Sequence, residues 1–577
     1  EGELYDDLVT RLLSDTLTAI SRYRNSLPGM KKLLEAFADG ANYYLSTHPA
    51  VKPALIRRFQ PWMPLLFPEG SIGGNRSSIS TERLKNFYSG DNATGSVEDA
   101  DPDVGSTGSN GFAIAPSRSA SKNSILLINP HTSFYFRSEV HAVSDEGLNV
   151  YGAVTWGQFF VYQGFNANWG WMHTTSRADA IDEYAEKIVR KNDSVYYEFD
   201  KKLLPLKTES ITIKFKSGDV TSEKKFKIYR THHGPVVGER EGRWITFKML
   251  DDPLAAITQS YMRTKSKDIT DFTKWMELKT NTSNGTTFAD SKGNIAYWHG
   301  NFVPRRNQEF DWSLPVDGST KETEWKGLHE VSEIVQIVNP ENGWIQNCNS
   351  TPFTGAGPNS PKKENYPAYM APDSETTRAI NAVRLLSHEK QFTPDKVIEA
   401  AYDRYLASFE VLLPPLIKAY EGSPDSTKKI LQEPIRLLQT WDMRSSVESQ
   451  ATTLAITWAA RMRSTFRDSD QAIVEKTSAS EKLKKLTEAM EELRKNFGSW
   501  KVAWGEVNRY QRLTGKINET FDDRKPSVPV GLASGAFGSL PSYAARKFPG
   551  TIKNYGVVGN SFVCVVEFGK KVKAKSI

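Results

Sequence analysis

The sequence predicts an α+β fold in which a strand-rich core is interrupted by a helical block. From residue 109 onward, short apolar runs bounded by turn residues, such as NGFAIA and NSILLINPH, are typical of β-strands. Between about 375 and 500, apolar residues recur at helical spacing, and the chain then returns to strand in NSFVCVVEFG. Because strands, helices and strands follow one another in this order, we expect one interwoven fold.

The composition divides the chain into five segments. Residues 1–88 are expected to be helical, since MKKLLEAFADGANYYLSTHP carries apolar residues at a spacing near 3.6. Residues 89–108 contain almost no apolar side chain, which predicts a flexible acidic linker. Residues 109–374 form the strand-rich part, 375–500 a helical lobe, and 501–577 a return to the core.

Charge and hydropathy exclude several classes of protein. The 74 basic and 68 acidic residues give a net charge of only +6, and no Lys/Arg run resembles a nucleic-acid-binding arm. No apolar run reaches the roughly 18 residues that a membrane span needs. The two cysteines, Cys348 and Cys564, are too few for a cysteine-based zinc site, and whether they pair stays open.

Common catalytic motifs are missing from the sequence. There is no HExxH motif, no Walker loop, no GxGxxG after a strand and no GxSxG at a strand-to-helix turn. His232 and His233 are adjacent on a predicted strand, where neighbouring side chains point to opposite faces. We therefore expect one packed and one exposed histidine, and no metal shared between them.

Ser109 stands where the acidic linker meets the first strand. A serine hydroxyl is a poor nucleophile unless a base takes its proton. If the chain were cut between Gly108 and Ser109, the new α-amine, with a pKa of about 7.7–8, would supply that base from the same residue. The small Gly108 lets the hydroxyl approach its carbonyl, so this junction is a candidate processing site.

The residues around this junction resemble a known family. GSNGFAIAPSRSASKNSILLINPHTSF looks like the processing site and second-chain start of the penicillin acylase family of N-terminal-nucleophile (Ntn) hydrolases. EAFADGANYYLSTHP, FADSKGNIAYWHGNFVPRR and NPENGWIQNCNSTPF are similar to further blocks in the same order. The resemblance implies an Ntn-hydrolase αββα sandwich with a large helical lobe. It also implies that segments preceding residue 1 and following residue 577 are missing.

The resemblance implies roles for several residues. Ser109 corresponds to the nucleophile exposed by self-cleavage after Gly108. His131, in NPHTSF, resembles the active-site position that holds His in the cephalosporin and homoserine-lactone acylase branches, where it helps to orient the nucleophile. Thr175, in MHTTS, matches the position whose backbone N–H contributes to the oxyanion hole.

The second oxyanion donor of the family is an Asn side chain shortly before an Ala-Asp pair. Here TSNGTTFAD offers Asn284, one residue further from the pair than usual, and Gly285 occupies the expected place. We expect the flexible Gly285 to let Asn284 reach the site. Arg306, in VPRR, resembles an arginine that positions this asparagine and the serine amine.

A structural calcium ion is a further implication of the resemblance, although catalysis needs no cofactor. RADAIDEY places Asp179 and Asp182 close together with the Ile181 carbonyl between them, as in calcium-binding members. Oxygen ligands of this kind suit a hard cation. The acidic ligand expected from the first chain is absent from GGNRSSIS, which has Asn and Ser there.

The resemblance thus implies a self-processing N-acyl amide hydrolase that acts on acyl-homoserine lactones, β-lactam antibiotics or related N-acyl compounds. The acyl group would enter an apolar pocket formed partly by Phe134, Phe159 and Phe160, and the alternative for each of them is packing in the core. The two processed chains would form a heterodimer, in the periplasm or secreted, as the resemblance implies. The alternatives are a non-catalytic binding protein on the same fold and a metal-dependent amidase.

Overall fold

The computed structural model describes residues 2–66, 78–89, 108–134, 137–192, 194–465, 468–516 and 518–576. Apart from its two ends, Ser89 and Gly108, the linker predicted over residues 89–108 lies outside the described residues. No helix among them combines the length and the apolar character that a membrane crossing needs.

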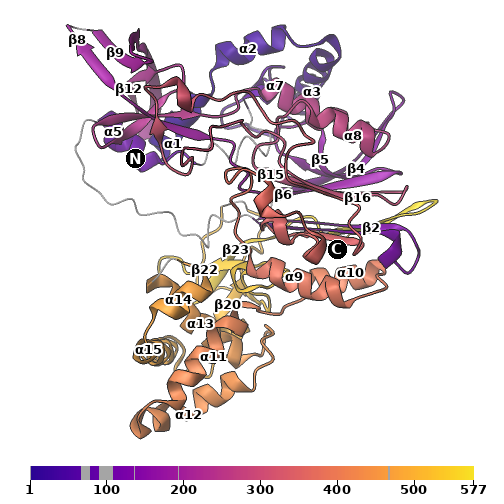
Figure 1. Ribbon diagram of the computed structural model, residues 1–577, viewed down its shortest axis with the longest axis vertical. Helices are drawn as coiled ribbons and strands as arrows, with labels where there is room; N and C mark the ends of the chain where they lie inside the picture. Colours follow the sequence, from indigo (N-terminus) through magenta and orange to yellow (C-terminus); the bar gives the residue numbers. More distant parts are fainter. Residues whose placement is uncertain are drawn as a thin grey trace.

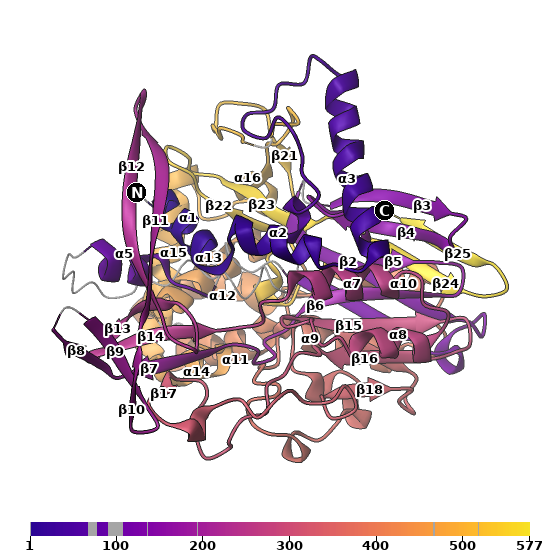
Figure 2. The same ribbon diagram turned by 90° about the horizontal axis from the view of Figure 1, so that it is seen from above.

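Two β-sheets stacked face to face form the centre of the molecule (Figures 1 and 2). In the nine-stranded sheet, the order β19-β1-β2-β23-β20-β21 is extended by β22 on β23 and by β24 and β25 on β2. Its strands are β1 (Ser109–Ile114), β2 (Ser124–Ser133), β19 (Trp344–Asn347), β20 (Asn508–Tyr510), β21 (Val528–Pro529), β22 (Ala544–Arg546), β23 (Asn554–Asn560), β24 (Cys564–Phe568) and β25 (Val572–Ser576). Strand β2 therefore joins the start of the core to its C-terminal strands.

The second sheet has seven strands in the order β18-β16-β15-β6-β5-β4-β3. Their bounds are β3 (Arg137–Ser144), β4 (Leu148–Thr155), β5 (Val161–Phe165), β6 (Trp169–Thr175), β15 (Asn284–Asp290), β16 (Ile295–His299) and β18 (Gln336–Val338). Helices α7 (Pro253–Arg263) and α8 (Ile269–Met276) lie on this side of the molecule, and Phe272 of α8 packs with Trp171 and Phe288 of the sheet.

Side-chain alternation explains how four layers stack. Along β1, Phe112 and Ile114 pack against α9 (Thr377–His388) and α10 (Pro394–Ala401), whereas Ala113 packs between the sheets. Successive strand residues point to opposite faces, so a strand buried on both sides has apolar residues at every position. The resulting helix–sheet–sheet–helix order confirms the predicted αββα sandwich.

A strand-rich lobe projects from the core and carries two helices of the first segment (Figure 1). Its strands are β7 (Asp182–Glu186), β8 (Ile188–Lys191), β9 (Ser194–Phe199), β10 (Lys202–Pro205), β11 (Lys207–Ser217), β12 (Val220–Arg230), β13 (Val236–Arg240), β14 (Arg243–Lys248) and β17 (Val316–Asp317). The helices of the first segment are α1 (Gly2–Leu13), α2 (Thr16–Arg24), α3 (Pro28–Thr47) and α5 (Thr81–Ser89). The lobe carries α1 and α5, whereas α2 and α3 pack beside β5 and α7. Leu8 of α1 and Leu84 of α5 pack with Phe226 and Phe247 of this lobe.

The helical lobe is smaller than the predicted 375–500. Helices α9 and α10 cover the nine-stranded sheet, so they belong to the core layers. The lobe itself packs around Trp458 and Leu486, and its helices are α11 (Ser408–Glu421), α12 (Asp425–Gln439), α13 (Gln450–Thr465), α14 (Asp470–Lys476), α15 (Ala479–Phe497) and the short α16 (Trp504–Val507). Helical spacing in a sequence does not tell which partner a helix covers, and this explains the difference.

The two cysteines do not pair. Cys348 and Cys564 are both free and fully buried, and burial raises the pKa of each thiol to about 12. A buried thiol of this kind packs as a small apolar side chain.

Candidate active site

The candidate site lies in a large cleft of 2520 Å³ between the stacked sheets, the strand-rich lobe and the helical lobe. The sequence-predicted residues Gly108, Ser109, His131, Thr175 and Asn284 line this cleft. Asp179, Ile181 and Asp182 line it as well. Residues predicted from widely separated motifs therefore meet at one place.

Ser109 is the first residue of β1 and is 6% exposed. Its backbone N–H donates to Asn349 Oδ1 at 2.6 Å. Its hydroxyl donates to the carbonyl oxygen of Gly108 at 2.5 Å. The candidate nucleophile thus lies directly against the peptide bond that joins the linker to the core.

Arg378 and Asn349 hold this end of β1, and neither was predicted from the sequence. Arg378 Nη1 donates to Ser109 O at 3.0 Å and to Asn110 Oδ1 at 2.6 Å, and its Nη2 donates to Asn349 Oδ1 at 2.7 Å. Arg378 lies in the first turn of α9, which Thr376 caps by accepting from the Ala379 N–H. A planar guanidinium can bridge three oxygens in this way because its donors have a fixed fork geometry.

Asn349 follows β19 with φ of +55°, a left-handed conformation that asparagine tolerates better than most residues. Its amide orientation follows from its partners. The Oδ1 atom accepts from Ser109 and Arg378, and Nδ2 donates to Thr175 O at 2.9 Å. Asn349 therefore joins the nucleophile strand to the end of β6. In the sequence, the only indication of this role was that Asn349 is a polar residue in the loop after NPENGWIQN.

Gly108 has no room for a side chain. A Cβ atom there would lie 2.9 Å from Arg378 Nη2, 3.0 Å from Asn349 Oδ1 and 3.3 Å from His131 Nδ1. The His131 backbone N–H donates to Gly108 O at 2.8 Å. Position 108 therefore accepts only glycine without rearrangement, because three polar groups lie close to the peptide bond that precedes Ser109.

His131 is completely buried in β2. Burial, together with the nearby Arg378, lowers its pKa well below the ordinary value, so the imidazole is neutral. Its Nε2 lies 3.2 Å from Asn129 Oδ1 and 3.4 Å from Asn110 Nδ2. In the tautomer with the hydrogen on Nε2, this atom donates to Asn129 and Nδ1 is the acceptor. The Nδ1 lone pair has no hydrogen-bond partner among the described residues and lies on the side of Gly108.

Thr175 ends β6 and pairs with Asn284, the first residue of β15. The next pair of residues, Ser176 and Ser283, is joined by a backbone hydrogen bond, in which the Ser176 N–H donates to Ser283 O at 2.8 Å. Bonded and non-bonded pairs alternate in an antiparallel ladder. The Thr175 N–H therefore points away from β15, which is the orientation that a backbone oxyanion donor needs.

Alternation along β15 decides which residues face the nine-stranded sheet, called the nucleophile sheet because it carries the candidate nucleophile Ser109. Thr287 faces it, because a Cβ on Gly111 of β1 would lie 2.9 Å from Thr287 Oγ1. Phe288 points to the opposite face and packs against α8. Gly285 shares the face of Thr287, and Asn284 shares the face of Phe288.

Asn284 consequently does not reach towards β1. Its Nδ2 donates to the Tyr162 hydroxyl at 2.6 Å. A side chain cannot be accommodated at position 285, because a Cβ there would lie 2.2 Å from the Tyr297 hydroxyl. This corrects the expectation that Gly285 lets the Asn284 amide turn towards Ser109. Asn284 lines the cleft, but a shift of one residue along a strand moves its side chain to the other face of β15.

Arg306 contacts the acidic pair and not the nucleophile. Its Nε donates to Asp182 Oδ2 at 2.8 Å, its Nη1 donates to Asp179 O at 2.8 Å, and its Nη2 lies 3.4 Å from Asp179 Oδ1. None of the contacts described for Arg306 joins it to Ser109 or Asn284, which differs from the predicted role. Burial raises the pKa of Asp179 to about 7, although Arg306 opposes this shift.

These residues do not fit a calcium ion. Calcium takes six to eight oxygen ligands, whereas here a guanidinium already lies against both carboxylates and one carbonyl. Trp325 Nε1 also donates to Asp182. An ion could bind only by displacing Arg306, so we assign no chemistry to calcium.

The three phenylalanines expected to line the acyl pocket do not line the cleft. Phe134 packs with Tyr510 and Tyr543, and Phe159 and Phe160 pack with each other in a separate apolar cluster. The aromatic residues that line the cleft are Tyr162, Phe247, Phe310, Trp312 and Tyr369. Their sequence positions carry no periodic signal that marks a pocket.

The tandem histidines confirm the expected exposed and packed pair but not the strand on which that expectation rested. Residues 231–234 form a bend between β12 and β13 instead of a strand, so alternation does not separate the two side chains. His232 is exposed and His233 is buried, yet both rings contact Glu324. This cluster does not line the cleft.

Comparison with known proteins agrees with this geometry. The family model described as penicillin amidase matches residues 1–577. Penicillin G acylase of Escherichia coli is 25% identical over 352 residues, which cover 58% of this chain and 39% of that protein. The acyl-homoserine lactone acylase QuiP of Pseudomonas fluorescens is 24% identical over 368 residues, covering 60% of this chain and 43% of that protein.

The matched regions therefore span about two fifths of the length of these curated relatives. Among solved structures, a thermostable penicillin G acylase from Alcaligenes faecalis superposes with a TM-score of 0.58 at 18% identity. The superposition covers 81% of this chain and 89% of that chain. At this identity the likeness establishes the fold.

Proposed function

The chain belongs to the penicillin amidase family, and on that premise we propose that it is a self-processing N-acyl amide hydrolase with Ser109 as its nucleophile. One observation carries the proposal: the Ser109 hydroxyl lies against the Gly108 carbonyl at the base of the cleft. The substrate class is an N-acyl compound, such as an acyl-homoserine lactone or a β-lactam antibiotic. The names of the relatives support this class and no narrower one.

Self-cleavage would begin with attack of Ser109 Oγ on the carbonyl carbon of Gly108. The amide is replaced by an ester on Oγ, and the proton lost by the hydroxyl reaches the departing Ser109 nitrogen. Water then hydrolyses the ester, which frees the Gly108 carboxylate and the Ser109 α-amine. The His131 N–H on Gly108 O supports polarisation of this carbonyl, and the neutral Nδ1 of His131 can accept a proton.

Hydrolysis of the substrate would use the new α-amine as the base for the Ser109 hydroxyl. Asn349 Oδ1, which accepts from the Ser109 nitrogen, would orient the amine. The Thr175 N–H would stabilise the oxyanion of the tetrahedral intermediate. The leaving amine takes the proton, and water then releases the acyl group from Oγ.

The two processed chains would remain together as a heterodimer. Tyr5, Leu8 and Leu12 of the first segment are buried against Phe226, Ile245 and Phe247, which follow the cleavage site in sequence. Arg83 also forms an ion pair with Glu183. These contacts support an apolar interface that cleavage at Gly108 does not touch.

Intact-mass analysis of the purified protein tests the proposal. We expect two chains, the larger beginning at Ser109, and a single uncut chain for Ser109→Ala. Ser133→Ala is the matched control, since Ser133 also lines the cleft, and it should be cut normally. Product screens with acyl-homoserine lactones, penicillins and N-acyl amino acids should show activity in the wild type and none in Ser109→Ala.

A non-catalytic binding protein on the same fold is the second candidate. The observation in its favour is that Gly285 faces the nucleophile sheet without a side chain, while the Asn284 amide binds Tyr162. A single uncut wild-type chain that binds an N-acyl compound without hydrolysing it would establish this alternative.

A further inference from the structure

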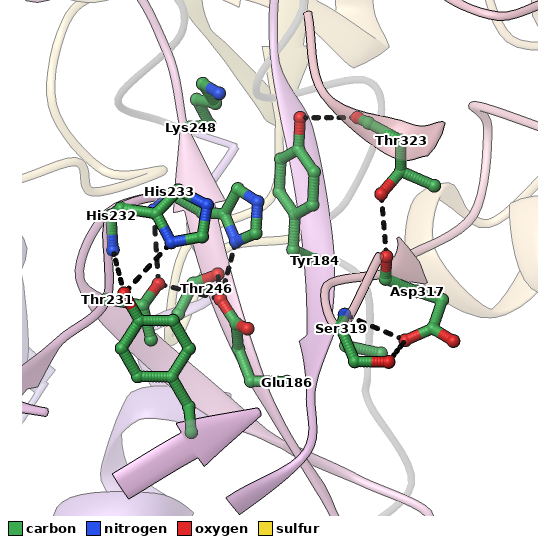
Figure 3. A network of polar contacts seen from close by, with 12 residues as sticks. Tyr184, Glu186, Thr231, His232, His233, Thr246, Lys248, Asp317, Ser319 and Thr323 are labelled. Atoms are coloured by element: carbon green, nitrogen blue, oxygen red, sulfur yellow. Dashed lines mark hydrogen bonds and ion pairs between the residues drawn. The ribbon is translucent and has the colours of Figure 1, made fainter. Parts of the chain in front are cut away.

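Three side chains outside the cleft, His232, His233 and Glu324, converge on one point in the strand-rich lobe. Figure 3 shows the two histidines of this cluster with Glu186 behind His233. His233 Nε2 lies 2.6 Å from Glu324 Oε1, and His232 Nε2 lies 3.0 Å from the same oxygen. The three ligand atoms lie within 4.8 Å of one another. Glu324 directly follows the short helix η3 (Lys321–Thr323), so the cluster joins two segments distant in sequence.

The second nitrogen of each imidazole is held by another group. His233 Nδ1 lies 2.8 Å from Glu186 Oε1, and His232 Nδ1 lies 3.0 Å from the Tyr197 hydroxyl. Both nitrogens of the His233 ring thus lie against carboxylates, Nδ1 against Glu186 and Nε2 against Glu324. If Nδ1–H donates to Glu186, a metal between Nε2 and Glu324 would take the place of the hydrogen that Nε2 shares with Glu324. A carboxylate behind a ligating histidine is a recurrent feature of zinc sites, because it fixes the tautomer and the ring orientation.

Glu186 is itself firmly positioned. Its side chain is fully buried, and Oε1 also accepts from the hydroxyls of Thr231 and Thr246 at 2.7 and 2.8 Å. The His233 ring stacks on Tyr184 with centroids 3.8 Å apart. Ring position and tautomer of His233 are therefore set by groups that do not touch the point of convergence.

One side of the cluster is open. The His233 side chain is inaccessible, whereas the His232 and Glu324 side chains are 34% and 29% exposed. Lys248 Nζ lies 3.2 Å from Glu324 Oε2, so this lysine contacts the oxygen that faces away from the imidazoles. An ion could thus enter from the exposed side and keep water as a further ligand.

We propose that His232 Nε2, His233 Nε2 and Glu324 Oε1 form a binding site for a divalent transition metal of the zinc class. Two imidazoles and one carboxylate oxygen suit Zn²⁺, with ligand bonds of about 2.0–2.2 Å and ligand atoms about 3.3 Å apart in a tetrahedron. The observed separations of 2.6 and 3.0 Å need to open by less than about 1 Å, which small rotations of the two partly exposed side chains provide.

The site would clamp the lobe that borders the cleft. It joins the bend at residues 231–234 to the segment after η3, and Trp325 in that segment donates to Asp182, which lines the cleft. Bound metal should therefore stabilise this lobe without taking part in the chemistry at Ser109. Metal binding at this cluster and hydrolysis at Ser109 can therefore succeed or fail independently.

Cobalt spectroscopy and zinc titration of the full chain test the site. After treatment with a chelator and dialysis, Co²⁺ should give the visible absorption of a four-coordinate ion, and calorimetry should find one Zn²⁺ per chain. His232→Ala, at a partly exposed position, should weaken Zn²⁺ binding at least about 100-fold. Tyr197→Phe, which removes the hydroxyl that contacts His232 Nδ1 and accepts from the His232 backbone N–H, should weaken it about 10-fold.

His141→Ala is the matched control, because His141 is an exposed histidine on β3 away from the cluster. It should bind Zn²⁺ like the wild type. Zinc should also raise the melting temperature of the wild type and of His141→Ala, but not of His232→Ala. The proposal is overturned if the wild type takes up no zinc, or if His232→Ala binds it as tightly as the wild type and gives the same Co²⁺ spectrum.

Discussion

The two walls of the cleft differ in how completely they are organised. On the β1 side, Ser109, Gly108 and Asn349 are linked by hydrogen bonds to one another and to Arg378. On the β15 side, Gly285 faces the nucleophile sheet without a side chain.

This difference separates two requirements of the proposed chemistry. Generating the nucleophile needs only the β1 wall, where the bond to be cut and its polar partners already meet. Stabilising an oxyanion on a substrate needs donors from the other wall, where the Thr175 N–H is the available group. Self-cleavage and substrate hydrolysis should therefore respond differently to substitutions on the two walls.

The largest effect is expected from Arg378→Lys, which acts on the β1 wall. A lysine retains the charge but cannot reach Ser109 O, Asn110 Oδ1 and Asn349 Oδ1 together. Loss of two buried charge-assisted bonds, about 3–4 kcal/mol, should slow self-cleavage by roughly 100–1000-fold. Time-resolved intact mass measures this rate.

Arg384→Lys controls for a change of arginine within the same helix, since Arg384 contacts Asn381 away from Ser109. Thermal unfolding of both variants distinguishes loss of positioning from loss of the fold. Normal cleavage in a folded Arg378→Lys protein would contradict the role assigned to this guanidinium.

Gly108→Ala should slow self-cleavage by about 10-fold or more. The added methyl group would lie 2.9 Å from Arg378 Nη2 and 3.0 Å from Asn349 Oδ1, so the polar groups must separate from the scissile bond. Gly40→Ala is a suitable control, because a Cβ there meets no other atom within 4 Å. Equal cleavage rates in the two variants would show that the close packing at Gly108 has no functional effect.

Much of the β1 wall follows from local sequence. A glycine before a serine at a strand start, with a histidine in the next strand, lies within one hairpin, and antiparallel pairing brings such residues together. Arg378 and Asn349 could not be found in this way. They come from a helix and a loop more than 200 residues further along, and only the tertiary fold places them beside Ser109.

The β15 wall shows a different limit of sequence reasoning. The position of Asn284 was off by one residue from the expected spacing, and one residue is half a period in a strand. The same limit applies to His232 and His233, where the argument from alternation assumed a strand that the chain does not form. Spacing locates a motif, but the face of each side chain depends on the exact secondary structure.

Asn284→Ala should lower kcat of the cleaved enzyme less than about 10-fold. An oxyanion donor would cost about 100–1000-fold when removed, whereas the Asn284 amide is engaged by the Tyr162 hydroxyl on the other face of β15. Tyr162→Phe removes the same hydrogen bond from the other partner and should match Asn284→Ala. A 100-fold loss confined to Asn284→Ala would show that the amide turns towards the substrate.

The smallest effect concerns pH and stability at Asp179. Its pKa of about 7 in the folded protein exceeds the unfolded value of about 3.9, so the folded state binds the proton more tightly. The contribution to stability is complete below about pH 4 and is lost as pH rises through 7. Asp179→Asn lacks this titration, so it should be more stable than the wild type at pH 8 by roughly 1–2 kcal/mol, and not at pH 4.

Melting temperatures at both pH values measure the difference, with Asp145→Asn as a surface control. Adding Ca²⁺ at pH 8 completes the experiment. We expect no change, because Arg306 already lies against Asp179 and Asp182. A rise in the wild-type melting temperature that is absent in Asp179→Asn would instead mean that the ion displaces Arg306, and the guanidinium released from the acidic pair would then be free to move towards the β15 wall.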